Sequence, residues 1–315
     1  MIVVFGSINL DLVARTERLP QPGETIAGIS FAMLPGGKGA NQAIAARRAG
    51  AHVAMAGAVG TDLFAAAALS GLVAAGVDVA WVRQDAAPTG VALIHVDAGG
   101  QNAITVIPGA NANVLAATVP DEALGPGNTV VLQLEVPLDA VRGIASRARQ
   151  RGARVMLNAA PARLLPATLL ALLDVLVVNA IEAATLAAAA GLPGAPEAFA
   201  TAMHRRHGCG VVVTLGSRGV VAAVDGTLFN AVAPDVHVVD TTGAGDAFVG
   251  ALAAALDRNN GWRRAIAAGV AAGSLACTVA GAQPSLPAAG AIRRLALTVE
   301  STLISRRLDR SAELP

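Results

Sequence analysis

Short runs of apolar and β-branched residues alternate with alanine-rich stretches of helical length along most of the chain. The runs that predict strands are residues 2–5, 53–56, 130–134, 155–157, 176–178 and 211–214. The stretches that predict helices are residues 41–49, 64–75, 138–149, 182–189 and 244–256. Alternation of this kind predicts parallel βαβ units, and therefore a doubly wound, mostly parallel α/β sheet flanked by helices.

Two segments break this rhythm and predict strands outside the main sheet. Residues 12–35 carry prolines and glycines around a possible extended piece at 25–33, and residues 89–107 alternate in polarity around a Gly-Gly turn. The second pattern is typical of a β-hairpin. We expect one α/β domain over residues 1–300 with a small β-sheet lid from both segments, and a peripheral helix or frayed tail at 301–315.

Composition and charge exclude several classes of protein. Hydrophobic residues make up 54% of the 315 residues and charged residues 14%, which excludes general disorder. The formal net charge is +1, and no run of Lys or Arg exceeds two, so a nucleic-acid partner is not expected. Cys209 and Cys277 match no zinc motif and fit a reducing cytoplasm. The charge-free stretch at 265–292 is interrupted at 281–285, which favours a buried helix followed by a loop over a membrane span.

Residues 240–246, Asp-Thr-Thr-Gly-Ala-Gly-Asp, are the most informative segment. They lie between an extended run at 236–239 and a helical run, with Gly243 and Gly245 at the mouth of the helix. Free N–H groups at a glycine-rich helix start attract anions such as phosphate. Asp246 would then lie beside the anion, although an isolated Asp at this position is more often a helix cap.

Two further glycine-rich segments are candidate ligand contacts. Residues 36–41, Gly-Gly-Lys-Gly-Ala-Asn, match neither the Walker A loop nor G-x-G-x-x-G, and alone they are typical of an ordinary turn. With Asn9 and Asp11 they could offer polar groups to a sugar. Residues 214–219 follow a buried strand at the edge where α/β sheets bind ligands, and they are either a nucleotide contact or a plain turn.

Taken together and in order, these segments resemble the ribokinase branch of the PfkB carbohydrate kinases. The matching segments are residues 6–11, 22–25, 36–43, 133–135, 161–163, 179–182, 214–219, 240–246 and 281–285. The resemblance implies the ribokinase-like α/β fold and an ATP-dependent sugar kinase. It further implies that the 5-hydroxyl of D-ribose is phosphorylated, with ATP as co-substrate and Mg²⁺ and K⁺ as cofactors.

The resemblance also implies a role for each matched residue. Asp246 would be the general base beside an anion hole formed by the backbone of Gly243, Ala244 and Gly245. The expected sugar contacts, besides Asp246, are Asn9, Asp11, Gly37, Lys38, Asn41 and Glu135. The expected ATP contacts are Asn179, Thr214, Gly216, Gly219 and Gly245. Glu182 would hold Mg²⁺ through water, and the expected K⁺ ligands are oxygens of Asp240, Thr242, Ala276, Val279, Gly281 and Ser285.

Departures from the family pattern leave some properties open. The family often has Asn-Glu-x-Glu where this chain has Asn-Ala-Ile-Glu at 179–182, and Val270 stands where relatives often have Asn or His near adenosine. The alternatives are a kinase of fructose, a deoxy sugar acid or a nucleoside, and a non-catalytic sugar sensor. A nicotinamide dehydrogenase is excluded because no G-x-G-x-x-G follows the first strand. Lids of relatives pair two subunits, so we expect a cytoplasmic homodimer without a membrane or nucleic-acid partner.

Overall fold

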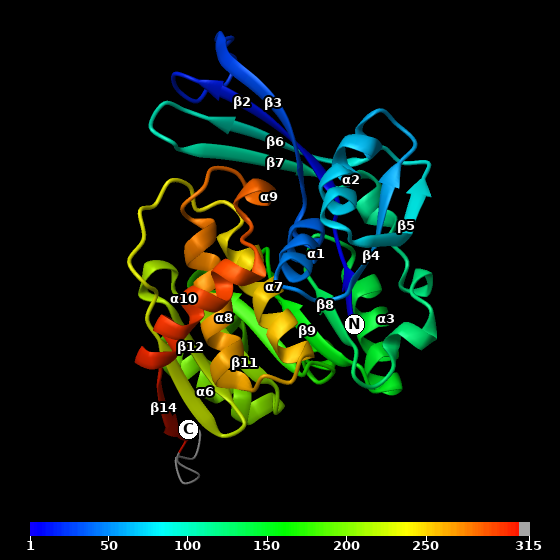
Figure 1. Cartoon of the computed structure of the whole chain (residues 1–315). Coiled ribbons are helices and arrows are strands. Elements are labelled where there is room, and N and C mark those ends of the chain that lie inside the picture. Colours follow the sequence, from blue (N-terminus) through cyan, green and yellow to red (C-terminus); the bar gives the residue numbers. More distant parts are fainter. Residues whose placement is uncertain (309–315) are drawn as a thin grey trace.

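The computed structural model describes residues 1–308, and its strands form two sheets (Figure 1). The larger sheet has ten strands in the order β14-β13-β12-β11-β10-β9-β8-β1-β4-β5. These strands are β1 (Ile2–Phe5), β4 (Val53–Gly60), β5 (Asp78–Asp85), β8 (Thr129–Leu132), β9 (Arg154–Asn158), β10 (Val175–Asn179), β11 (Gly210–Thr214), β12 (Val220–Val224), β13 (Thr227–Ala231) and β14 (Ile304–Arg307). Neighbours from β5 across to β11 are parallel, and β11 to β14 are antiparallel. The predicted mostly parallel, doubly wound sheet is confirmed.

Helices cover both faces of this sheet. The helices on one face are α1 (Lys38–Arg48), α2 (Phe64–Ala75), α7 (Ala244–Asp257), α8 (Trp262–Ala276) and α10 (Ala289–Thr302). Those on the other face are α3 (Leu138–Arg151), α4 (Ala167–Leu170), α5 (Ala180–Ala190) and α6 (Pro196–His207). Successive side chains of a strand point to opposite faces, so Ile2 and Val4 enter the first core whereas Val3 and Phe5 enter the second. All four are fully buried, as expected of a central parallel strand.

The smaller sheet projects beyond the helical layers at the top of Figure 1, above α1 and beside α2. Its strands, in the order β3-β2-β6-β7, are β2 (Asn9–Thr16), β3 (Gly28–Gly36), β6 (Gly90–Val96) and β7 (Asn102–Ile107). β2 begins at Asn9, three residues earlier than the pattern predicts, because Asn9 pairs with both Gly36 and Gly90. The second sheet expected from the sequence is therefore present.

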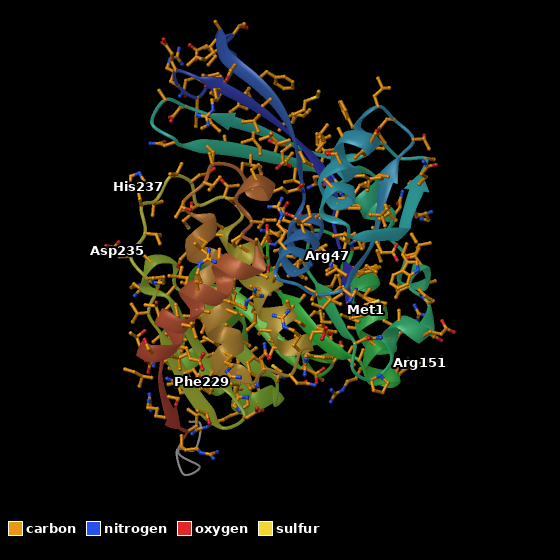
Figure 2. All side chains as sticks on the ribbon, in the orientation of Figure 1. Met1, Arg47, Arg151, Phe229, Asp235 and His237 are labelled. Atoms are coloured by element: carbon orange, nitrogen blue, oxygen red, sulfur yellow. The ribbon has the colours of Figure 1, made fainter. Side chains whose placement is uncertain are left out.

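Two segments differ from the expectations. Residues 236–239 form no strand, and instead the Val239 N–H donates a hydrogen bond to the Cys277 carbonyl oxygen at 2.8 Å. Figure 2 shows Asp235 and His237 at the outer edge of the molecule on this loop. At the C-terminal end, Ile304–Arg307 pair with β13 as an edge strand, which the local pattern did not indicate. The remainder of the predicted tail, residues 309–315, lies outside the described residues.

The charge-free stretch is divided between α8, the short helix α9 (Ala282–Ser285) and the start of α10. Within residues 1–308, no helix has the length and apolar character required to cross a bilayer. The short 3₁₀ turns of the chain are η1 (Gly109–Asn113), η2 (Ala116–Thr118), η3 (Asp121–Leu124) and η4 (Gly216–Arg218).

Candidate active site

The Asp246 carboxylate is buried in the first turn of α7 and is held through both of its oxygens. Asn41 Nδ2 donates to Oδ2 at 3.0 Å, and Gln42 Nε2 donates to Oδ1 at 2.9 Å. The residue does not cap its own helix, because the N-cap is Gly243, in the left-handed region at φ 78°, and no side chain makes the capping bond. The helix-cap interpretation of Asp246 is therefore wrong, and its side chain faces α1.

Asp246 lies in a cavity of about 230 Å³ at the carboxyl ends of β9, β10 and β11. The cavity is lined by Lys38, Asn158, Ala160, Val177, Val178, Asn179, Glu182, Thr214, Thr241, Gly243, Gly245, Asp246 and Val249. Residues expected to act on the sugar, the nucleotide and Mg²⁺ thus converge in one place. A larger cavity of about 440 Å³ lies at the amino ends of the strands, where the Arg149 and Asp174 side chains pair with each other.

Lys38 supplies positive charge among the carboxylates of the site. The negative charge of Asp246 raises the pKa of the Lys38 ammonium, and Glu135 and Glu182 add to this effect. Burial raises the pKa of Asp246, while Lys38 and the amides of Gln42 and Asn41 oppose the rise. A buried, hydrogen-bonded carboxylate beside a cation can accept a proton from a hydroxyl group.

Asp11 brings a second carboxylate to the site from the smaller sheet. Burial, reinforced by the charges of Glu135 and Asp246, raises the pKa of Asp11 to about 6. The carboxylate lies over Gly36 on the neighbouring strand, where an added Cβ would collide with it. Glu135 is held separately, because its Oε2 accepts bonds from Ser7 Oγ at 2.6 Å and from the Lys38 N–H at 3.0 Å.

The glycines of residues 36–41 allow α1 to begin directly against the β1–β2 connection. Gly37 is the N-cap at φ 91°, which favours glycine. A Cβ on Gly39 would lie 2.6 Å from the Ser7 nitrogen, and the Ala40 N–H donates to the Ser7 carbonyl oxygen at 3.0 Å. This close approach places Asn41 and Gln42 in the helical turn that faces Asp246.

Asn111 positions the start of β2, and sequence reasoning missed it. Its Nδ2 donates to Asn9 Oδ1 at 2.7 Å, and its Oδ1 accepts from the Ile8 N–H at 2.9 Å. The Asn9 side-chain oxygen is therefore engaged by Asn111, which leaves the amide nitrogen of Asn9 as its other polar group. An asparagine two positions after Pro-Gly is typical of a turn, so no local signal marks this role.

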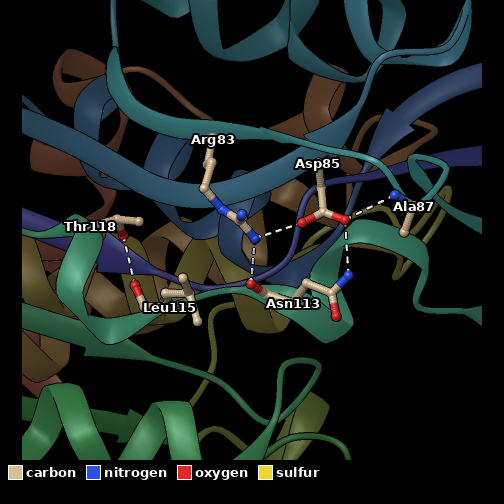
Figure 3. Close-up of polar contacts among 6 residues, drawn as sticks. All are labelled: Arg83, Asp85, Ala87, Asn113, Leu115 and Thr118. Carbon is tan, nitrogen blue, oxygen red and sulfur yellow. Dashed lines mark hydrogen bonds and ion pairs between the residues drawn. The ribbon is translucent and has the colours of Figure 1, made fainter.

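A polar network anchors the turn η1 that carries Asn111 (Figure 3). Arg83 donates to Asp85 at 2.6 Å and to the Asn113 carbonyl oxygen at 2.7 Å, and the Asn113 amide donates to Asp85 at 2.9 Å. The Ala87 N–H donates to the same carboxylate at 2.9 Å. The end of β5 thus holds η1 in place.

Asn179 and Glu182 form a reciprocal capping box at the start of α5. The Glu182 N–H donates to Asn179 Oδ1, and the Asn179 N–H donates to Glu182 Oε2, both at 2.8 Å. Burial raises the pKa of Glu182, and Lys38 opposes the rise. One oxygen of Glu182 and the amide nitrogen of Asn179 are left for ligands in the cavity. Gly216 and Gly219 lie farther along, where they open and close the turn η4 after β11.

Comparison with known proteins agrees with this geometry. Residues 1–289 match the pfkB family carbohydrate kinase model. The chain belongs to the pfkB family of carbohydrate kinases. It is therefore a phosphotransferase that acts on a sugar hydroxyl.

Similar proteins include ribokinases from several organisms. The ribokinase of Lactococcus lactis is 37% identical over 289 residues, which cover 91% of this chain and 93% of that protein. The structure of Thermotoga maritima ribokinase superposes with a TM-score of 0.86 at 31% identity, covering 93% of this kinase and 98% of the other chain. Arabidopsis thaliana ribokinase, solved with ribose and ATP, gives a TM-score of 0.84 at 32% identity and covers 94% and 98% of the two chains.

The residues of this carbohydrate kinase at the predicted potassium position fit a hard cation. Gly281 N–H donates to Asp240 Oδ2 at 2.8 Å, which joins the segment before α7 to the turn before α9. Burial alone would raise the pKa of Asp240, but bonds from Gly281 and Thr242 lower it overall, so the carboxylate stays ionised. An ionised carboxylate with nearby backbone and hydroxyl oxygens is a donor set that suits an alkali cation.

At the predicted magnesium position, Glu182 supplies one carboxylate to the cavity. Within the described part of the chain, no three His, Cys, Asp or Glu side chains gather into a metal-binding cluster. Mg²⁺ commonly binds to one or two carboxylates, water and the substrate phosphates, so Glu182 alone fits that mode. When bound, the ion would neutralise charge on the phosphates.

Proposed function

We propose that this kinase is an ATP-dependent ribokinase that phosphorylates the 5-hydroxyl of D-ribose. The observation that carries the proposal is the Asp246 carboxylate, which is buried at the mouth of α7 and held by Asn41 and Gln42. The similarity to ribokinases over most of the chain supports ribose as the sugar and ATP as the co-substrate.

Asp246 is the general base in this proposal. It takes the hydroxyl proton of the sugar while the sugar oxygen bonds to the γ-phosphorus and the bond to the β-phosphate oxygen breaks, which releases ADP. The N–H groups of Gly243, Ala244 and Gly245 lie at the N-terminus of α7, where the helix dipole stabilises negative charge. Lys38 adds a cation to the lining of the same cavity.

The polar side chains near the smaller sheet are the proposed sugar contacts. Asn9, held by Asn111, offers an amide donor, while Asp11 and Glu135 offer carboxylate acceptors for ring hydroxyls. Asn179, Thr214 and the turn η4 are the proposed nucleotide contacts, and Glu182 is the proposed contact to hydrated Mg²⁺. The proposed potassium ligands are the six residues named for that ion above. The two free cysteines are consistent with a reducing cytoplasm.

A coupled assay of ADP release tests the proposed function. D-Ribose, 2-deoxy-D-ribose, D-fructose and adenosine are compared with ATP and Mg²⁺, each with and without K⁺. We expect the highest kcat/KM with D-ribose and a higher rate with K⁺. A higher kcat/KM for fructose or adenosine would replace ribose as the substrate, and no turnover of any acceptor would favour a non-catalytic sugar sensor.

We also propose that two chains pair through the smaller sheet, which then forms the lid of the sugar site. Ile29, Phe31 and Met33 alternate along β3 and so share one face, with exposed fractions of 64%, 64% and 55%. Figure 2 shows how far this sheet stands out from the body of the molecule. A contiguous apolar face of this kind is typical of a protein interface.

Replacing Phe31 by Asp should separate the pair, because an ionised carboxylate would be buried in an apolar contact. Sedimentation velocity should give a two-chain mass for the wild type and a one-chain mass for Phe31→Asp at micromolar concentration. Leu297 on α10 is 69% exposed and far from this sheet, so Leu297→Asp is the matched control and should keep the two-chain mass. A one-chain wild type would contradict the proposal.

A further inference from the structure

Behind Asp246 lies a chain of three buried amide side chains that the sequence motifs did not assign. Gln42 and Gln133 are fully buried, and Asn158 is 8% exposed. Gln133 Nε2 donates to Gln42 Oε1 at 2.7 Å. Gln42 Nε2 in turn donates to Asn158 Oδ1 and to Asp246 Oδ1, both at 2.9 Å.

The orientation of each amide in this chain follows from its fixed neighbours. The Asn158 amide nitrogen donates to the carbonyl oxygen of Val177 at 3.2 Å, and a backbone carbonyl can only accept. Asn158 must therefore turn its oxygen toward Gln42, and that oxygen requires a donor. The Gln42 NH₂ group therefore points toward Asn158 and Asp246, its oxygen points to the other end, and Gln133 donates to that oxygen.

Gln133 has room for this orientation because residue 6 is glycine. Its Oε1 atom makes no hydrogen bond in the structure and lies against Gly6, where an added Cβ would collide with it. A buried amide oxygen without a partner is unfavourable, because it has lost its hydrogen bonds to water. Gln133 thus keeps its hydrogen bond from Nε2 to Gln42 although its own Oε1 has no partner.

We propose that Gln133, Gln42 and Asn158 form an amide relay that positions Asp246 and selects its ionised form as the base. The relay rests on the sugar kinase function proposed above and acts only through Asp246. Because the Gln42 NH₂ cannot turn away without breaking bonds at both ends, it offers a fixed donor to Asp246 Oδ1. A fixed donor stabilises an acceptor carboxylate and disfavours its protonated form. Asn41 holds the second oxygen independently.

Several charged groups also face Asp246, and they set the background against which the relay acts. Lys38 from α1 favours the ionised carboxylate, whereas Glu135, Asp11 and Glu182 disfavour it. None of these groups belongs to the relay. Removing a relay donor should therefore leave this charge pattern intact and move the acid limb of the kcat profile toward higher pH.

Gln42→Met and Gln133→Met test the relay, since methionine keeps most of the side-chain volume without donating. For Gln42→Met we expect kcat to fall about tenfold, because one hydrogen bond to a charged group is lost while Asn41 still holds Asp246. The KM for the sugar should stay within about twofold, because neither Gln42 nor Gln133 lines the cavity. Gln133→Met should give a smaller effect in the same direction. In both variants the acid limb of the kcat profile should lie at higher pH.

A double-mutant cycle separates positioning from a general effect on packing. In an Asp246→Asn background, Gln42→Met should cost no further turnover, because the group it positions has been removed. Thr129→Val is the matched control: Thr129 is buried at the far end of β8, its hydroxyl has no partner, and its loss should leave kcat and the pH profile unchanged.

Two results would overturn the relay. One is an acid limb of the kcat profile that lies at the same pH in Gln42→Met as in the wild type. The other is an equal loss of kcat from Gln42→Met whether residue 246 is Asp or Asn. Wild-type enzyme in the same assays distinguishes the two proposals. If the wild type turns over none of the acceptors, the proposed function itself fails. If it is active and the variants match it at every pH, only the relay fails.

Discussion

Replacing Asp246 by Asn should lower kcat by about 10²- to 10⁴-fold while the affinity for the sugar changes little. The amide keeps the size of the carboxylate but cannot accept the hydroxyl proton, so the loss falls on the chemical step. Its own NH₂ group would also face the donors of Asn41 and Gln42, which now approach the carboxylate oxygens at 3.0 and 2.9 Å. Steady-state kinetics with calorimetric titration of the sugar would separate turnover from binding.

Asp257→Asn is the matched control for this prediction. Asp257 lies at the opposite end of the same helix and pairs with the N-terminal amine at 3.3 Å, remote from the cavity. We expect wild-type kinetics from it. Near-normal turnover of Asp246→Asn would remove Asp246 from the role of base and leave the anion-binding helix start as the remaining part of the mechanism.

Replacing Asp11 by Asn should weaken sugar binding and stabilise the fold. The carboxylate is the proposed acceptor for ring hydroxyls, and losing hydrogen bonds to a charged group should raise the KM for the sugar by roughly 10- to 100-fold. Its charge is unfavourable in the absence of sugar, because burial together with Glu135 and Asp246 raises the pKa of Asp11 from 3.8 to about 6. The same residue therefore serves binding at the expense of stability.

The sign of the stability effect follows from proton binding. Between pH 3.8 and about 6 the folded state holds the Asp11 proton more tightly than the unfolded chain, so stability falls as the pH rises through this window. At pH 7 the ionised carboxylate is fully unfavourable, and Asp11→Asn should raise the free energy of unfolding by about 1 to 3 kcal/mol. Below pH 3.8 the difference should vanish.

Thermal unfolding at pH 7 and at pH 3.5 would measure this difference. Asp139→Asn is the control, since that side chain is 91% exposed on α3 and its loss should change stability little at either pH. Equal melting temperatures of wild type and Asp11→Asn at pH 7 would show that the Asp11 charge is not unfavourable in the fold.

Local signals in the sequence predicted most strands and helices of the α/β sheet. β1 and α2 have the predicted bounds, because a short apolar run and an alanine-rich stretch each end at clear polar or glycine positions. The edge strand β14 was missed because Ile304–Arg307 is extended only through its pairing with β13. An extended run was expected at 236–239, and the backbone there joins neither sheet but bonds to the end of α8.

For the candidate site, too, some features follow from local sequence and others from tertiary contacts. Local sequence was enough to predict a candidate anion site and base, because the glycine-rich start of α7 and the Asp246 carboxylate lie within one short segment. The surroundings of that carboxylate follow from the tertiary structure. Gln42 contacts it from α1 and in turn bonds to Gln133 after β8 and to Asn158 at the end of β9, and Asn111 reaches Asn9 across 102 positions of the chain. Such contacts depend on which strands and helices become neighbours in space, and no local pattern of side chains encodes that.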